Sequence, residues 1–434
     1  MTSRIKKPFH PAVPYVLLAL AVLGVYSNVY SGEFLFDDET LILRNQFIVG
    51  QLPLSELWTS SAGAGAGIVN NFYRPLQILL YVLVNELFGL SAPAFHALNV
   101  GLHLANALLV YTLGTRLGFK PIGVFLASLI WALHPLHTEA VTYMSATADT
   151  LHVTFCLIAL LIMLPDFSLR RVLWACFLFI LALLSKETSV VLPLLASTCI
   201  FLLSPKRLKP KTYLELWPLW VLGLVFAFIR LFVLDFQKHD TSFETNPILS
   251  IYAGDIMVRI YTALSALPHY FSLLLYPVGL HYERQFPITI DPWRLDVMLG
   301  FAIVAIAVAQ IVWGRGKRGL PISWAILWFI SAHSLNAGVI MRLNALFLEH
   351  WMYLPSIGLC LGLGQSLAQL FEKKKYKKMS GQVAVIAILL AALLGILTYR
   401  QNFIWQNAFT FYPNILKYKE PSVRALNNLA KAYA

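Results

Sequence analysis

The stretch PYVLLALAVLGVYSNVYSGEFLFDDE, residues 14–39, is an apolar run that ends at three consecutive carboxylates. The run approaches the roughly 20 residues that a helix needs to cross a bilayer. Basic residues at positions 4–7 precede it, and positive charge favours the cytoplasmic side of a membrane. No small-residue cleavage site follows, so we expect a retained first helix instead of a signal peptide. The carboxylates are therefore expected just outside the bilayer, on the face opposite the N-terminus.

The composition of the whole chain is that of a polytopic membrane protein. Of its 434 residues, 58% are hydrophobic and 12% are charged, which is more apolar surface than a soluble fold can bury. Short basic loops between apolar runs account for the net charge of +12, so the charge indicates topology and no nucleic-acid partner is expected. The cysteines all lie inside apolar runs without metal-ligand spacing and are expected to be small core residues. They are Cys156, Cys176, Cys199 and Cys360.

About eleven apolar runs are long enough to be membrane spans. They lie at roughly 13–32, 94–114, 122–140, 146–165, 172–185, 188–204, 214–234, 297–313, 320–338, 351–371 and 382–399. The fifth and sixth are short and are separated by only three residues, 185–187, which predicts a hairpin. With eleven spans every basic cluster falls on the same side, which places the N-terminus in the cytoplasm and the C-terminus outside.

Three further segments are expected outside the bilayer on the external side. Segments 76–90 and 259–277 are apolar, but either would invert the charge pattern if it crossed. Segment 76–90 is therefore predicted to be a helix lying at the interface, and 259–277 an interfacial or re-entrant helix. The tail 421–434 has the apolar spacing of a first tetratricopeptide-like helix, which cannot bury its own face. Either repeats continue beyond it or it packs on the membrane domain. We therefore expect a transmembrane domain at 1–400 and an external linker with a first repeat helix at 401–434.

Asp37 and Asp38 are the leading candidates for chemistry on this outer face. A carboxylate held at the membrane surface can act as a general base that removes a proton from a hydroxyl group. The alternative is a solvated loop whose carboxylates cap the following helix. Adjacency leaves open which of the two is the base, because neighbouring loop residues can point either way.

Lys186 is isolated within the apolar hairpin, where a lysine costs about 2.5–3.5 kcal/mol. It either pairs with the neighbouring Glu187 or faces a cavity and binds the phosphate of a lipid carrier. Further basic side chains near the outer side are expected to share this phosphate-binding role. They are Arg74, Arg259 and His350.

The segment HPLHTE, residues 134–139, places two histidines and a glutamate close together. A metal site is one interpretation, but the proline and the missing i, i+4 spacing argue against it, so no metal ligand is assigned. We expect an orienting or acceptor-binding role for several polar residues on this side of the membrane. They are His137, Glu139, Asp149 and Glu349.

The order and common sidedness of these motifs resemble the GT-C superfamily of lipid-phosphosugar glycosyltransferases. The nearer resemblance is to the transmembrane and tetratricopeptide-repeat O-mannosyltransferases and their bacterial relatives, over most of the membrane domain. It rests on FDDETLILRN (36–45), the segment from NFYRPLQ to LANALL (71–109), HPLHTEAVTYMSATAD (134–149), LLSKE (183–187), EHWMYLPSIGLC (349–360) and LNNLA (426–430).

The resemblance carries roles over by position. Asp37 and Asp38 match the two acids of the first external loop, and Arg74, Glu139 and Lys186 match the arginine, acid and lysine of three further motifs. Two positions depart from the family pattern. His350 stands where such relatives commonly show arginine, and the segment ATAD (146–149) stands where Gly-Arg-Ala-Asp is typical. Both departures remove a cation from the outer side.

These observations together predict an all-helical, GT-C-like membrane glycosyltransferase. The resemblance implies transfer of mannose from a polyprenyl-phosphate carrier to a Ser or Thr of a protein, with Asp37 as base and Asp38 polarising it. Cations would neutralise the leaving phosphate, so no metal or other cofactor is required. The expected partners are the lipid-linked donor, a protein or peptide acceptor and membrane lipids.

Alternatives differ in acceptor or in class. A transferase or ligase acting on glycans or lipids would share the carrier and the topology. A flippase or transporter would show polar, broken helices near the midplane and pseudo-symmetric halves, and no inverted repeat is visible. A scaffold that displays the repeats would not concentrate charge on one face. Compact loops without a retention signal favour the bacterial inner membrane over the endoplasmic reticulum.

Overall fold

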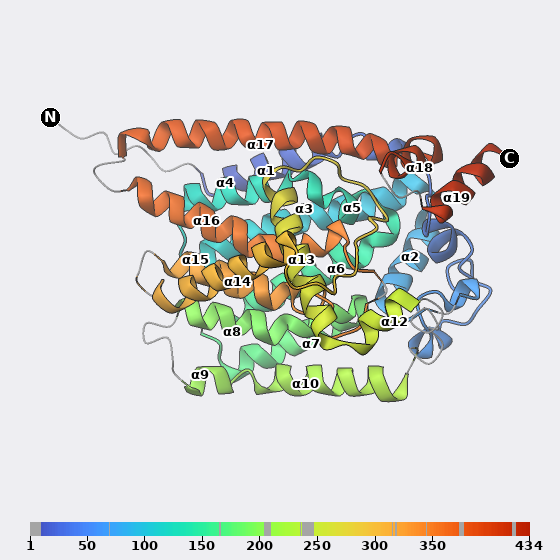
Figure 1. The fold of residues 1–434 in the computed structure, drawn as a ribbon, viewed down its shortest axis with the longest axis horizontal. Helices are drawn as coiled ribbons and strands as arrows, with labels where there is room; N and C mark the ends of the chain where they lie inside the picture. The colour runs from blue at the N-terminus through green and yellow to red at the C-terminus, as the bar shows by residue number, and fades with distance from the viewer. Residues whose placement is uncertain are drawn as a thin grey trace.

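The computed structural model describes residues 10–68, 70–164, 166–203, 210–234, 236, 247–314, 316, 319–343, 345–372, 377–418 and 422–434. Within these residues every regular element is a helix, as the sequence predicts. Figure 1 shows long helices lying side by side in stacked layers with their axes roughly parallel. Toward one end, on the right of the view, lie the irregular loop that follows the first helix and helices α2 (Pro75–Phe88), α12 (Pro247–Gly254), α18 (Ala408–Leu416) and α19 (Val423–Tyr433).

Six helical stretches among the described residues are long and apolar enough to cross a membrane. They are Val13–Ser31, Ala92–Arg116, Met144–Met163, Lys211–Val233, Leu295–Trp313 and Ser380–Trp405. A seventh is possible if Pro121–Ala132 and Pro135–Val141, which meet at 52°, form one bent span. The chain is therefore a helical membrane protein, whereas eleven spans stay a prediction.

Each of the eleven predicted runs nevertheless overlaps a helix, although several of these helices are shorter than the run. These helices are α1 (Val13–Val25), α3 (Ala92–Arg116), α4 (Pro121–Ala132), α6 (Thr147–Met163), α7 (Leu169–Ser185), α8 (Leu192–Leu203), α10 (Trp217–Phe228), α14 (Leu295–Trp313), α15 (Leu320–His333), α16 (Pro355–Phe371) and α17 (Ser380–Asn402). The two segments predicted to be interfacial form α2 (Pro75–Phe88) and α13 (Ile256–Leu275). Proline stands in the first turn of α2, α4, α15 and α16, where its missing N–H costs no hydrogen bond.

Glycines let α16 approach its neighbours closely. A Cβ atom at Gly358 would lie 2.5 Å from the Trp328 ring, and one at Gly362 would lie 2.7 Å from the Pro321 carbonyl, both on α15. On α4, the Gly123 carbonyl would lie 2.6 Å from a Cβ atom at Gly364. Small residues four apart permit such contacts between membrane helices, where lipid provides no hydrophobic drive for association.

Buried hydrogen bonds join the helices of the core. The His103 ring on α3 lies 2.7 Å from the Tyr353 hydroxyl through Nδ1 and 2.9 Å from the Ala132 carbonyl of α4 through Nε2. Asn106, one turn further along α3, donates to the Thr150 carbonyl of α6 at 2.8 Å. Each bond would leave an unpaired polar group in an apolar interior if the helices slid past one another, so the network sets their register.

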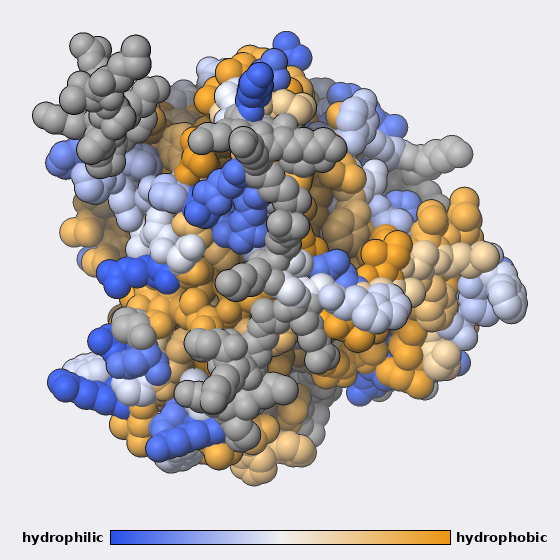
Figure 2. Space-filling view, turned by 90° about the vertical axis from the view of Figure 1, so that its left-hand side faces the viewer, coloured by the Kyte–Doolittle hydropathy of each residue, from blue (hydrophilic) through white to orange (hydrophobic). Residues whose placement is uncertain are grey.

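The two ends of the molecule differ. In Figure 1 helix α9 (Pro210–Leu214) and the N-terminal end of α17 lie at the left end. Helices α18 (Ala408–Leu416) and α19 (Val423–Tyr433) lie at the right end, near the loop before α2. Figure 2 views the left end and shows hydrophilic patches separated by hydrophobic surface. The sides between the ends expose large apolar residues such as Ile306 on α14 and Leu389 on α17, as a lipid-facing surface does.

Candidate active site

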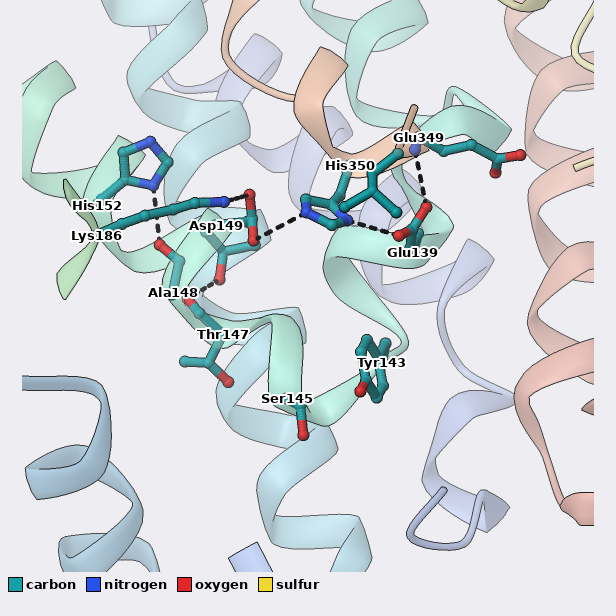
Figure 3. A network of polar contacts seen from close by, with 12 residues as sticks. Glu139, Tyr143, Ser145, Thr147, Ala148, Asp149, His152, Lys186, Glu349 and His350 are labelled. Atoms are coloured by element: carbon teal, nitrogen blue, oxygen red, sulfur yellow. Dashed lines mark hydrogen bonds and ion pairs between the residues drawn. The ribbon is translucent and has the colours of Figure 1, made fainter. Parts of the chain in front are cut away.

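A row of buried and partly buried ionisable side chains links four short stretches of the chain (Figure 3). The Lys186 ammonium lies 2.5 Å from Asp149 Oδ1. The His350 ring lies between two acids, with Nε2 at 4.0 Å from Asp149 Oδ2 and Nδ1 at 2.6 Å from Glu139 Oε1. Four of the residues predicted from the sequence, separated by up to 211 positions, therefore form one network.

Breaks in the helices bring these side chains together. Pro135 ends the first half of the bent segment and α5 (Thr138–Val141) begins beyond it, which places Glu139 beside the core. Lys186 follows α7 in an extended conformation (φ −158°, ψ 134°), so its side chain leaves the helix direction. His350 lies in the short helix η10 (Glu349–Met352) before α16. Polar residues at helix ends can point inward without interrupting a membrane span.

Lys186 does not pair with the neighbouring Glu187, which was one of the two expectations from the sequence. Its partner is Asp149, and both side chains are 6% exposed. Glu187 instead pairs with Arg74 at 3.7 Å and accepts a hydrogen bond from the backbone N–H of Tyr73. Lys186 and Arg74 thus each have an acidic partner, so the positive charge at this centre is already largely neutralised.

Glu349 connects the network to Arg284, which was not predicted from the sequence. Its backbone N–H donates to Glu139 Oε2 at 3.0 Å, and its own carboxylate accepts from Arg284 at 3.0 Å and from the backbone N–H of His281 at 3.0 Å. Burial and the like-charged Glu139 raise the pKa of Glu349 to about 8, although Arg284 favours the ionised form. Arg284 lies in a loop with no recognisable motif, so no sequence signal pointed to it.

Two shallow recesses adjoin this centre. One encloses about 250 Å³ out to solvent and is lined by the charged residues Asp149, Lys186 and His350. The other encloses about 260 Å³ and is lined by Tyr252 and His333. Asn336 lines both recesses, so the recess with ionisable residues lies next to the one lined by Tyr252 and His333.

Asp38 and Asp37 have different environments. Asp38 is 1% exposed and accepts three hydrogen bonds, from the N–H of Leu35 at 2.9 Å and from the N–H and hydroxyl of Ser145 at 2.8 and 2.5 Å. Burial raises the pKa of Asp38 to about 7, although these bonds favour the ionised form. The Asp37 side chain is 32% exposed and lies 2.6 Å from the Arg424 guanidinium. The structure thus distinguishes the buried Asp38 from the partly exposed Asp37, which their neighbouring positions in the sequence could not do.

The remaining predicted residues lie apart from this network or lack polar partners. His137 is packed against the rings of Trp131 and Tyr353, and neither ring nitrogen has a hydrogen-bond partner among the described residues. Arg259 on α13 is half-buried, and in the described part of the chain its Nε has no hydrogen-bond partner. In the part of the chain that the structure describes, no three His, Cys, Asp or Glu side chains are grouped to hold a metal ion.

The fold and the site together define a polytopic helical membrane protein with a buried centre of paired charges. No protein-family model matches the chain. It is similar to a protein O-mannosyl-transferase of Caenorhabditis elegans, with 26% identity over 432 residues, 96% of this chain and 59% of that protein. It is also 26% identical to protein O-mannosyl-transferase TMTC4 of Homo sapiens, over 83% of this chain and 56% of that protein.

A third relative is protein O-mannosyl-transferase TMTC3 of Homo sapiens, with 25% identity over 96% of this chain and 49% of that protein. The resemblance that the sequence motifs indicate is therefore confirmed. The chain spans between about half and three fifths of the length of these relatives.

Proposed function

We propose that this chain is a membrane glycosyltransferase that moves mannose from a polyprenyl-phosphate carrier to the hydroxyl of a protein Ser or Thr. The observation that carries the proposal is the partly exposed carboxylate of Asp37, which lies against Arg424 on a loop that Asp38 joins to the segment before α6. The names of the similar proteins supply the reaction class and the acceptor. The lipid carrier is part of the proposal and is compatible with the membrane fold, because a phosphosugar on a polyprenyl chain resides in the same bilayer.

The proposed reaction is a single displacement. The acceptor hydroxyl gives its proton to the carboxylate of Asp37 as its oxygen bonds to the anomeric carbon. The bond from that carbon to the phosphate oxygen breaks, and its electron pair stays on the lipid phosphate. The sugar ring passes through an oxocarbenium-like state and its configuration inverts.

Asp38 contributes by holding the loop. Its three hydrogen-bond donors come from Leu35 and Ser145, so it joins the loop to the segment before α6. A carboxylate that is buried with three donors cannot reach an acceptor, whereas Asp37 can. Asp37 is therefore the proposed base and Asp38 its support.

Cations near the charged centre would receive the departing phosphate. Lys186, Arg74 and His350 lie near Asp149, Glu187 and Glu139, so a phosphate has to compete with these acids. Arg259 on α13 is a further cation proposed for this role, and its Nε has no hydrogen-bond partner among the described residues. A phosphate that neutralises cations through charge-assisted hydrogen bonds needs no added metal.

The proposed topology has eleven spans, a cytoplasmic N-terminus and an external active site, with the bacterial inner membrane favoured over the endoplasmic reticulum. The arrangement of the helices supports this topology, because the loop that carries Asp37 and Asp38 lies at the same end of the molecule as α18 and α19. The docking of α19 on that end fits an acceptor-binding role for the C-terminal segment, since repeat arrays form concave binding surfaces.

A transfer assay with reconstituted protein tests this function. The substrates are radiolabelled polyprenyl-phosphate mannose and Ser/Thr-rich peptides. We expect Asp37→Asn to reduce labelling of peptide by about 10²–10⁴-fold, which is the usual contribution of a general base. Glu39→Gln is the matched control, because it removes an adjacent, exposed carboxylate that pairs only with Arg44 in the described chain, and it should retain activity.

Two results would contradict the proposal. Turnover by Asp37→Asn equal to that of Glu39→Gln would remove Asp37 from the base role. Movement of the labelled lipid across the bilayer without any transfer to peptide would indicate a flippase instead.

A further inference from the structure

The first turn of α19 docks on the loop that carries Asp37. One guanidinium nitrogen of Arg424 lies 2.6 Å from Asp37 Oδ1, and another lies 3.6 Å from Glu283 Oε1. The guanidinium also covers the ring of Phe36, at 3.7 Å from the ring centroid. A planar guanidinium that is stacked and paired with two acids has little freedom to move.

The helix is fixed at the same place by packing and capping. Ala425 is fully buried in a cluster with Leu35 and Phe36 of the loop. The Ser422 hydroxyl accepts from the Ala425 N–H, which caps the helix, and donates to Glu283 at 2.5 Å. Arg424 is therefore positioned by its neighbours on both sides.

The backbone around Arg424 is strained. Phe36 and Glu283 both have positive φ angles, 55° and 54°, which side-chain-bearing residues rarely adopt. Both residues contact Arg424, and Phe36 directly precedes Asp37. Such strain persists where surrounding contacts determine the conformation, and it clusters at functional sites.

We propose that Arg424 is a positioning residue for Asp37, an inference that rests on the proposed function. The guanidinium holds Oδ1, and no donor among the described residues contacts Oδ2, which is left to receive the acceptor proton. The Asp37 backbone is fixed separately, because its N–H donates to the Tyr143 hydroxyl at 3.2 Å. A residue of the C-terminal helix thereby completes the geometry of a base that lies 387 residues earlier in the chain.

The test uses the full chain in liposomes, with labelled polyprenyl-phosphate mannose and a Ser/Thr-rich peptide. We expect Arg424→Ala to lower kcat about ten- to hundredfold, as a misplaced catalytic group does, with the donor KM unchanged. Arg424→Lys should recover part of the loss, since it keeps the charge without the planar fork. The matched control is Lys431→Ala, which removes the same charge from an exposed site on the same helix and should leave kcat unchanged.

A double variant separates positioning from general damage to the fold. If Arg424 acts through Asp37, adding Arg424→Ala to Asp37→Asn should cause no further loss of kcat. A kcat of Arg424→Ala equal to that of Lys431→Ala, or an additive loss in the double variant, would overturn the inference. Full activity of Asp37→Asn would instead defeat the proposed function, so the two failures are distinguishable.

Discussion

At the scale of single residues, the buried pair of Lys186 and Asp149 shows how this chain keeps charge inside an apolar domain. Each charge alone would be costly there, and together they are tolerated because they lie 2.5 Å apart. In the proposed reaction, Lys186 can exchange its Asp149 partner for the phosphate of the lipid donor, because both are anions.

We expect Lys186→Met to lower the free energy of unfolding by about 3–5 kcal/mol, because it removes the ammonium that lies against the buried Asp149 carboxylate. The double variant Lys186→Met/Asp149→Asn should recover a large part of this loss, since no charge is then unpaired. Chemical unfolding in detergent micelles measures both. A single variant as stable as the parent would show that the pair contributes nothing to stability.

The residues of the site were more predictable than their pairing. Asp37, Glu139, Lys186 and His350 stood out because charged groups are rare beside apolar runs. Their partners depend on helix rotation and on breaks near Pro135, which no local pattern specifies. Arg424 was missed although it lies in a recognised helix, because its role comes from a contact across 387 residues.

Among the elements, the loop before α14 secures the C-terminal segment by a stacked pair of rings. His281 lies with its ring 3.6 Å from that of Tyr418, and its Nδ1 lies 2.7 Å from the Gly279 carbonyl. The same loop supplies Arg284 to Glu349, so it links the charged centre to the segment that leads into α19.

This link should make stability sensitive to acid. Burial and then Arg284 lower the pKa of His281 to about 4, whereas an unfolded histidine titrates near about 6.5. The unfolded chain therefore binds more protons between these values, so stability is complete above about pH 6.5 and falls as the pH drops toward 4. We expect His281→Phe, which keeps a ring against Tyr418, to reduce the loss of thermal stability between pH 7.5 and 5.

His10→Phe provides the control, because it removes an exposed imidazole that is not part of the stacked pair. Other buried histidines keep a residual dependence in both variants. An unchanged slope in His281→Phe would contradict the assignment of this part of the acid sensitivity to the stacked pair.

The presence and approximate position of the long helices could be predicted from the sequence, but their exact ends and their packing partners could not. Hydrophobic runs gave every long helix, because apolar length is a strong signal. The contact of α16 with α15 had a sequence signal too, the Gly358 and Gly362 pair at four-residue spacing, although only the structure shows which helix faces it. Lengths such as the 12 residues of α4 and α8 result from bends and breaks that hydropathy averages out.

For the molecule as a whole, the two ends lead to a test of orientation. Gln51 is exposed in the loop that carries Asp37, and Met379, 48% exposed, directly precedes α17. Figure 1 shows the N-terminal end of α17 at the end of the molecule opposite this loop. The proposed topology places Gln51 outside and Met379 in the cytoplasm.

Cysteines at these two positions should label from opposite sides. With the native cysteines replaced by alanine, we expect an impermeant maleimide to label Gln51→Cys in sealed right-side-out vesicles and Met379→Cys only in inside-out vesicles. Labelling of both from one side would contradict the topology. Labelling in the reversed sense would invert it and move the active site to the cytoplasm.

The contact of α19 with the loop that carries Asp37 couples the docking of the helix to ligand binding at Asp37. By thermodynamic reciprocity, a ligand that shifts the Asp37 carboxylate must alter the hold on α19 by the same free energy. Tyr433, 74% exposed near the end of that helix, could therefore carry a fluorophore that reports occupancy at a distance. The C-terminal helix would then act as a built-in sensor, readable in the membrane without disturbing the site.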